Sequence, residues 1–213
     1  MRSLTCFPVI RRRGSFVLRL VAATALAGAV TACSTGTPTE TGAPAATAAA
    51  TAAAYGGIVI SAASLTPGQP VPKPAGKAVL TLTGKITATN RDGALALDQS
   101  TIEKMGVEQV QLYEPWTKET LDFRGVWLQH LLAVAGAAPD ATKVHIVALD
   151  DYAVDLSLAD VRAGGIMLAT RDGAGGQIPV DKGGPTRIVF MDGVKAGDNP
   201  DQWVWSLKSI DVQ

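Results

Sequence analysis

The chain has 213 residues, with 19 basic and 19 acidic side chains, and 47% of its residues are hydrophobic. Five of the 19 basic residues and none of the acidic ones precede Cys33, which leaves 14 basic against 19 acidic side chains in the remainder. That acidic balance argues against nucleic-acid binding, which needs a basic surface, and the hydrophobic content excludes disorder of the whole chain.

The first 33 residues have the three zones of a bacterial export signal. Arginines dominate the start, and an apolar run of 11 residues follows from Leu20 to Val30, too short to cross a bilayer. Val30-Thr31-Ala32-Cys33 resembles the lipobox of bacterial lipoproteins, whose cysteine is acylated. We therefore predict a signal peptide over residues 1–32 and a lipid anchor on Cys33 that holds the protein at the extracytoplasmic face of the cell membrane. The alternative is an ordinary signal peptide with an incidental cysteine.

The residues after Cys33 divide into a tether, a lead-in and a domain. Nine alanines and six threonines make up most of residues 34–54, so segment 33–54 is predicted to be a flexible tether. Four prolines favour an extended lead-in over residues 55–78, and residues 79–213 form the predicted domain. Since Cys6 and Cys33 both lie in the export segment, that domain has no disulfide and no cysteine metal site.

Short strands dominate the predicted structure of the domain. Apolar and polar residues alternate in several runs, each bounded by glycine or a turn. The runs predict strands at 58–60, 79–89 with a break at Gly84, 107–113, 120–123, 144–149, 166–170, 187–191 and 203–212. In the last of them, Trp203, Trp205 and Leu207 are expected on one face.

Three short helices complete the pattern. One is predicted over 98–105, with Asp98 or Ser100 as the N-cap and Glu103 as a capping-box partner. A second spans 126–135 and ends at Gly136, and a third spans 158–163 with Ser157 as its cap. Many strands joined by short turns, with few short helices, predict an α+β fold with mixed β-sheets rather than a doubly wound sheet.

Five sequence segments occur in an order that is typical of one family. The segments are Phe123 to Leu128 with Leu131, Leu132 and Gly136; Ala148 to Tyr152; Met167 to Ala169; Gly183 to Val189; and Trp205 to Leu207 with Ile210 and Val212. Together they resemble the molybdopterin-binding domain of the sulfite oxidase family, in its small secreted bacterial form. The resemblance covers residues 79–213 and implies an α+β domain that, in full-length members, holds a molybdenum–pterin cofactor for oxygen-atom transfer.

The resemblance assigns a role to two residues of this chain, and a third residue of the family's site is missing here. Tyr152 matches the family's tyrosine near the metal, and Arg187 matches an arginine close to the pterin. The family's metal-ligating cysteine corresponds to the stretch 110–116, which contains none. Tyr113 or Glu114 would replace a thiolate poorly at a soft, high-valent centre. We therefore expect no molybdenum cofactor, with bound molybdopterin as the alternative.

Five side chains are predicted to contact a ligand: Tyr152, Arg187, Lys182, Asp151 and Arg171. The three cations flank a glycine-rich segment and form either an anion pocket or ordinary solvated charges. Asp151, with Asp150 before it, forms either a turn or a carboxylate pair for a cation. The two tryptophans of the last strand are either core or a sugar-stacking platform.

These observations favour a membrane-anchored binding or accessory domain for a small anionic or pterin-like ligand, rather than an enzyme. A molybdopterin-dependent oxidoreductase with an unusual metal site is the first alternative. A structural envelope lipoprotein that binds another protein is the second.

Overall fold

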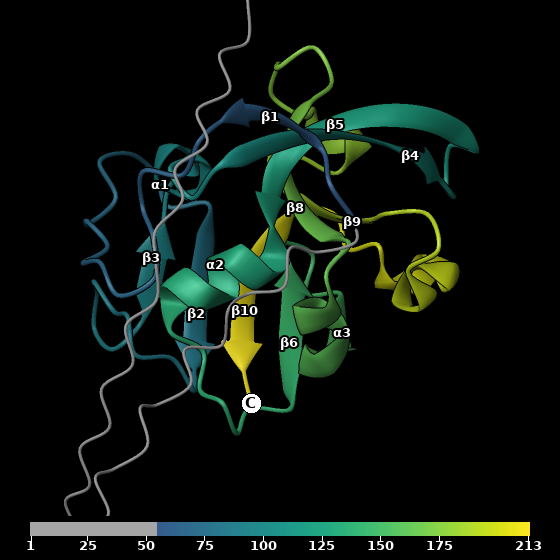
Figure 1. The fold of residues 1–213 in the computed structure, drawn as a ribbon. Helices are drawn as coiled ribbons and strands as arrows, with labels where there is room; N and C mark the ends of the chain where they lie inside the picture. Colours follow the sequence, from purple (N-terminus) through teal and green to yellow (C-terminus); the bar gives the residue numbers. More distant parts are fainter. Residues whose placement is uncertain (1–54) are drawn as a thin grey trace, which may run out of the picture. The chain divides into compact units, whose positions relative to one another are not determined.

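A computed structural model of the protein describes residues 55–213. The predicted signal peptide, Cys33 and the tether therefore lie outside the described residues. Within the described part, residues fold around two five-stranded sheets (Figure 1). The first sheet has the order β1-β4-β5-β8-β9 and is antiparallel throughout. Its strands are β1 (Ile58–Ser61), β4 (Val107–Glu114), β5 (Glu119–Trp127), β8 (Ile166–Asp172) and β9 (Arg187–Phe190).

The second sheet is mixed and contains the C-terminal strand at its centre. Its order is β3-β2-β10-β6-β7, in which β10 runs parallel to β2 and every other pair is antiparallel. Mixed sheets with few short helices confirm the predicted α+β class. The strands are β2 (Leu80–Gly84), β3 (Leu95–Leu97), β6 (Lys143–Ala148), β7 (Ala153–Ser157) and β10 (Leu207–Val212).

Three short α-helices cover the sheets: α1 (Gln99–Glu103), α2 (Leu128–Ala135) and α3 (Leu158–Ala163). Helix α2 packs against β5, β8 and α3 with its leucine face, and Gly136 ends it with a left-handed backbone, as predicted. One hydrophobic core contains residues of both sheets and of all three helices. In residues 55–213 no helix has the length and hydropathy needed to span a membrane.

The predicted elements are mostly present, and the differences have local causes. Strand β5 runs through Gly125 to Trp127, so α2 begins two residues later than predicted, because Val126 and Trp127 pair with β8. Strands β3 and β7 were not predicted. The last strand begins only at Leu207, because Ser206 has a φ of 50° that interrupts the extended backbone. Before it lie three short 3₁₀-helices: η1 (Val180–Lys182), η2 (Lys195–Asp198) and η3 (Pro200–Gln202).

Asp98 is the N-cap of α1 and also fixes the lead-in. Its carboxylate is buried and accepts hydrogen bonds from the backbone N–H groups of Ala75, Gly76 and Thr101, at 2.8, 3.0 and 2.8 Å. Hydrogen bonding from Thr101 lowers the pKa of Asp98 well below its usual value, and this outweighs the opposing effect of burial. Glu103 is not the predicted capping-box partner, since its carboxylate binds Arg171 instead.

Replacing Asp98 with alanine should lower the free energy of unfolding by about 2 kcal/mol near neutral pH, because the buried N–H of Thr101 and the part-buried N–H groups of Ala75 and Gly76 lose their acceptor. The carboxylate has a lower pKa in the folded than in the unfolded chain, so its contribution is present above the unfolded value, about 3.9, and declines below it. Urea unfolding at pH 7 and at about pH 3 should therefore give a smaller difference between wild type and variant at the acidic pH. A difference that does not change with pH would contradict this account.

Candidate functional site

Two neighbouring cavities form the candidate site. The aromatic cavity, of about 360 Å³, is lined by three segments: the β4–β5 turn, the β6–β7 turn, and the chain from η3 to the start of β10. The two turns belong to different sheets, so the cavity lies where the sheets meet the 3₁₀ segment. Its lining residues are Trp116, Ala148, Asp150, Tyr152, Pro200, Asp201, Trp203 and Trp205.

The second cavity is named the Arg187 cavity and measures about 240 Å³. Trp205 lines both cavities and therefore lies at the boundary between them. Two cations, Lys182 and Arg187, lie among four carboxylates in its lining. The full lining is Thr117, Glu119, Leu121, Asp122, Phe123, Asp172, Ile178, Pro179, Asp181, Lys182, Arg187 and Trp205.

A buried ion pair joins the end of β4 to the start of β9. Arg187 Nη2 donates to Glu114 Oε1 at 2.6 Å, and the side chains are 2% and 0% exposed. Glu114 Oε2 also accepts from the backbone N–H of Thr117, and Arg187 Nη1 donates to the carbonyl of Lys182 at 3.1 Å. Burial lowers the pKa of the Arg187 guanidinium, while Glu114 acts in the opposite direction and keeps the group charged.

Aromatic rings complete the surroundings of that guanidinium. Its carbon lies 4.6 Å from the ring centre of Trp205 and 5.3 Å from that of Phe123, both within cation–π range. The indole N–H of Trp205 and the Nε of Arg187 are buried and have no hydrogen-bond partner among the described residues. Arg187 is therefore a fixed, neutralised element of the site.

The other predicted ligand residues occupy different places. Tyr152 lines the aromatic cavity and its hydroxyl donates to the carbonyl of Asp201 at 2.9 Å. Lys182 lines the Arg187 cavity together with Arg187. Tyr152 and Arg187 therefore line different cavities. Asp151 lies in the β6–β7 turn, outside both linings, and pairs with Lys208 at 2.8 Å on the surface.

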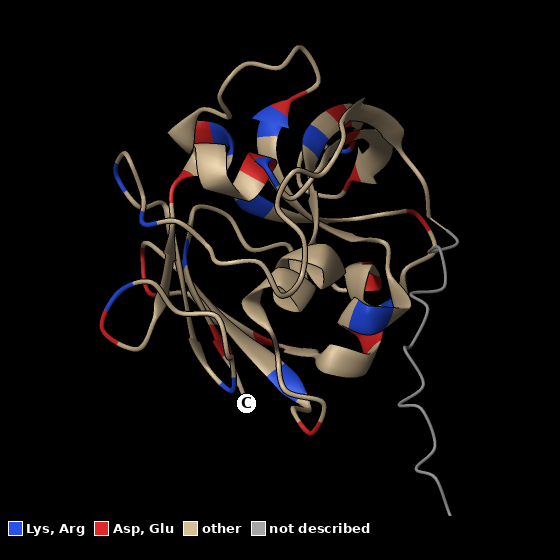
Figure 2. Ribbon diagram, turned by 60° about the vertical axis from the view of Figure 1, so that its left-hand side comes forward, with Lys and Arg blue, Asp and Glu red and all other residues tan. Residues whose placement is uncertain are grey.

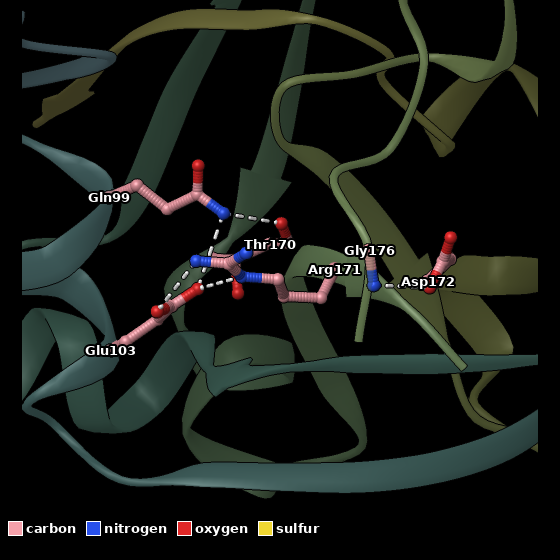
Figure 3. Close-up of polar contacts among 6 residues, drawn as sticks. All are labelled: Gln99, Glu103, Thr170, Arg171, Asp172 and Gly176. Atoms are coloured by element: carbon pink, nitrogen blue, oxygen red, sulfur yellow. Dashed lines mark hydrogen bonds and ion pairs between the residues drawn. The ribbon is translucent and has the colours of Figure 1, made fainter. Parts of the chain in front are cut away.

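Arg171 lies in β8 (Figure 3). It lines neither of the two cavities. Its Nε and Nη2 donate to the carboxylate of Glu103 in α1, at 2.7 and 3.2 Å. Gln99 donates to the same carboxylate and to the carbonyl of Thr170, which ties α1 to β8. Hydrogen bonding to Glu103 raises the pKa of Arg171. These contacts give Arg171 a structural role between α1 and β8.

Glu114 and Trp116 are among the site residues that were not predicted from the sequence, and the sequence pattern contains a signal for Glu114 only. Val110, Leu112 and Glu114 alternate along β4 and all three are buried, so a carboxylate occupies an inward-facing position. A buried charge requires a partner, and that requirement could have identified Glu114. Trp116 follows in the exposed turn, where the sequence pattern gives no indication of a cavity.

The charges around the site act locally. Figure 2 shows lysines and arginines interspersed with aspartates and glutamates along the described chain. The aromatic cavity has two carboxylates and no lysine or arginine in its lining. A charged ligand therefore interacts mainly with the charges of the cavity lining, rather than with a broad surface of one sign.

Comparison with known proteins connects this site to one family. The sequence model described as the oxidoreductase molybdopterin binding domain matches residues 96–212. No curated protein matches the chain. Among solved structures, the sulfane dehydrogenase SoxCD from Paracoccus pantotrophus is similar, with 14% identity and a TM-score of 0.48 over 62% of this chain. The chain covers 37% of that protein's chain, well under two thirds of its length.

The residues at the site do not fit a cysteine-ligated molybdenum–pterin group. No cysteine occurs after Cys33, so the domain has no thiolate to ligate the metal. At the end of β4, in the stretch that the resemblance assigns to the metal ligand, Glu114 is already bound to Arg187. A phosphorylated pterin also needs cations, whereas carboxylates outnumber cations in both linings.

Proposed function

This chain belongs to the oxidoreductase molybdopterin binding domain family, and we propose that it uses the family's fold as a ligand-binding domain rather than as a redox enzyme. The domain would act at the extracytoplasmic face of the cell membrane, tethered through a lipidated Cys33. Its ligand would occupy the aromatic cavity, which has the size and apolar lining of a small-molecule site.

One observation carries this proposal: the buried pair of Glu114 and Arg187. The two side chains come from the stretches that the family resemblance assigns to the metal ligand and to the pterin-binding arginine. Here they neutralise each other at 2.6 Å, so neither is available to a cofactor without breaking a buried ion pair. The aromatic cavity on the other side of Trp205 is left for a ligand.

A thermal-shift screen of small molecules tests the binding function directly. A ligand that binds only the folded state raises the midpoint of unfolding in proportion to the logarithm of its concentration above the dissociation constant. Ligands of the aromatic cavity should raise the midpoint of the wild type but have a much smaller effect on Trp116→Ala. That variant removes an exposed ring from the lining and leaves the core intact. Shifts that are equal in both proteins would place the ligand elsewhere.

Anchoring is tested by Cys33→Ala, which should release the protein from the membrane fraction or leave it with its signal peptide uncleaved. The reason is that acyl chains supply the retention, at about 0.8 kcal/mol for each buried methylene. The measurement is fractionation of host cells, with the cleavage state read by mass spectrometry. A correctly cleaved variant that stays with the membrane would contradict the lipid anchor.

The family match supports a second candidate, a molybdopterin-dependent oxidoreductase with an unusual metal site. It requires that an oxygen ligand such as Glu114 replace the thiolate and that Arg187 leave its present partner. The two candidates differ in one observable, the molybdenum content of protein purified from its own host.

A further inference from the structure

We propose that the aromatic cavity binds an organic cation, such as a quaternary ammonium or a protonated amine. This inference rests on the proposed binding function and specifies its ligand. It differs from the anionic or pterin-like ligand expected from the sequence, because the structure separates the aromatic cavity from the cations of the Arg187 cavity by Trp205.

The lining of the aromatic cavity has the chemistry of a cation-binding site. Four aromatic rings line the cavity, and cations bind the faces of tryptophan and tyrosine rings in preference to neutral groups. Two of the rings are held in place: the Trp203 indole donates to the carbonyl of Gly197 at 2.9 Å and packs on Phe190, with ring centres 5.4 Å apart. The Tyr152 hydroxyl is fixed by the Asp201 carbonyl at 2.9 Å. A prearranged cavity of this kind loses little entropy when a ligand enters.

Two rings of the lining remain open to a ligand. Trp116 and Tyr152 are 54% and 45% exposed, whereas Trp203 is 6% exposed. The β4–β5 turn carries Trp116 and the β6–β7 turn carries Tyr152, so these rings approach the cavity from different sheets. An entering cation can therefore contact the exposed rings of Trp116 and Tyr152 as well as the buried ring of Trp203.

The charged groups of the lining also favour a cation. Asp150 and Asp201 are the only ionisable side chains of the lining apart from Tyr152, and both are carboxylates. Asp150 accepts the N–H of Tyr152 at 3.1 Å, which holds its carboxylate in the turn beside that ring. The nearest buried cation, Arg187, lies against Trp205 and is neutralised by Glu114. Carboxylates attract a cation and repel an anion.

The test uses the full-length protein, purified in a non-ionic detergent, and choline as the probe. Its control ligand is 3,3-dimethylbutan-1-ol, which has the same shape without the charge. Isothermal titration and tryptophan fluorescence should show saturable binding of choline. The neutral analogue should bind about tenfold more weakly or worse, the ratio expected for one or two desolvated cation–π contacts plus a carboxylate.

Variants then assign the binding to the aromatic cavity. Trp116→Ala and Asp201→Asn should each weaken choline binding by about three- to thirtyfold. The matched control is Asp140→Asn, which removes one negative charge from an exposed ion pair with Lys85, outside both cavities. The control should change binding less than about twofold, because distant surface charges are screened. Circular dichroism of each variant checks that it is folded.

Three outcomes would overturn the organic-cation proposal. One is equal binding of choline and its neutral analogue, and another is a choline affinity that Asp201→Asn and Asp140→Asn change equally. The third is the failure of choline, tetramethylammonium and butylamine to bind at all. If glucose or sulfate then binds in a Trp116-dependent way, the ligand class is wrong while the binding function stands. Stoichiometric molybdenum in the host-purified protein would instead remove the binding function itself.

Discussion

Replacing Glu114 with alanine is expected to lower the free energy of unfolding by about 3–5 kcal/mol, a large part of the stability of a single domain. The Arg187 guanidinium is 2% exposed, so the variant would keep a buried charge without its partner. Such a charge cannot be neutralised by losing its proton, because arginine stays protonated in proteins. Urea or thermal unfolding measures the loss directly.

A double variant separates the ion pair from simple loss of packing. Glu114→Leu combined with Arg187→Met removes both charges and keeps apolar volume, so it should recover most of the stability lost by Glu114→Ala. Two results would contradict the buried-pair account: a loss below about 1 kcal/mol for Glu114→Ala, or a double variant less stable than Glu114→Ala alone.

Gly125→Ala should lower the free energy of unfolding by about 3 kcal/mol or more. Gly125 lies in β5 opposite Ala169 of β8, at an irregularity in the register of the two strands. An added Cβ would overlap the carbonyl oxygen of Leu168 and lie 2.8 Å from the Cα of Ala169, so the clash is with backbone that cannot rotate away. The measurement is the unfolding midpoint in urea.

Gly56→Ala is the matched control for this substitution. No atom lies within 4 Å of a Cβ built at Gly56, which is exposed. The same chemical change should therefore alter the free energy of unfolding by no more than about 0.5 kcal/mol. Equal effects at both positions would show that close contact between β5 and β8 does not constrain Gly125.

Local signals account for the parts of the fold that could be predicted from the sequence. The N-cap Ser157 defines α3 over the predicted residues, and the alternation along β4 identifies that strand. The last strand was predicted too long because Trp203 and Trp205 continue its alternation. Only tertiary contacts give Ser206 its positive φ: its N–H and hydroxyl bind the carbonyls of the Gly183–Gly184 turn.

The site depends on contacts between distant parts of the sequence, which local patterns do not contain. Glu114 and Arg187 are 73 positions apart, and nothing near either residue indicates its partner. The family resemblance predicts that Tyr152 and Arg187 contact one ligand, but the two residues line different cavities. Asp150 comes from the β6–β7 turn and Asp201 from η3, so their shared cavity becomes visible only in the folded domain.

The family fold and the chemistry of the site lead to different expectations for this domain. A chain of the oxidoreductase molybdopterin binding domain family is expected to hold a cofactor. The end of β4, however, carries a carboxylate that is already paired, and the neighbouring cavity is aromatic and acidic. A domain that keeps its fold but loses its cofactor ligands needs no change in the core, because the core and the cavities use mostly different residues.

The most direct test of the central claim is the molybdenum content of the protein purified from its own host. Elemental analysis by plasma mass spectrometry, together with fluorescence of oxidised pterin released by denaturation, should find both far below one equivalent per chain. Glu114→Ala, which frees Arg187, should not raise either value, since no thiolate is gained. Stoichiometric molybdenum and pterin in the wild-type protein would contradict the account and identify the chain as a cofactor-holding member of its family.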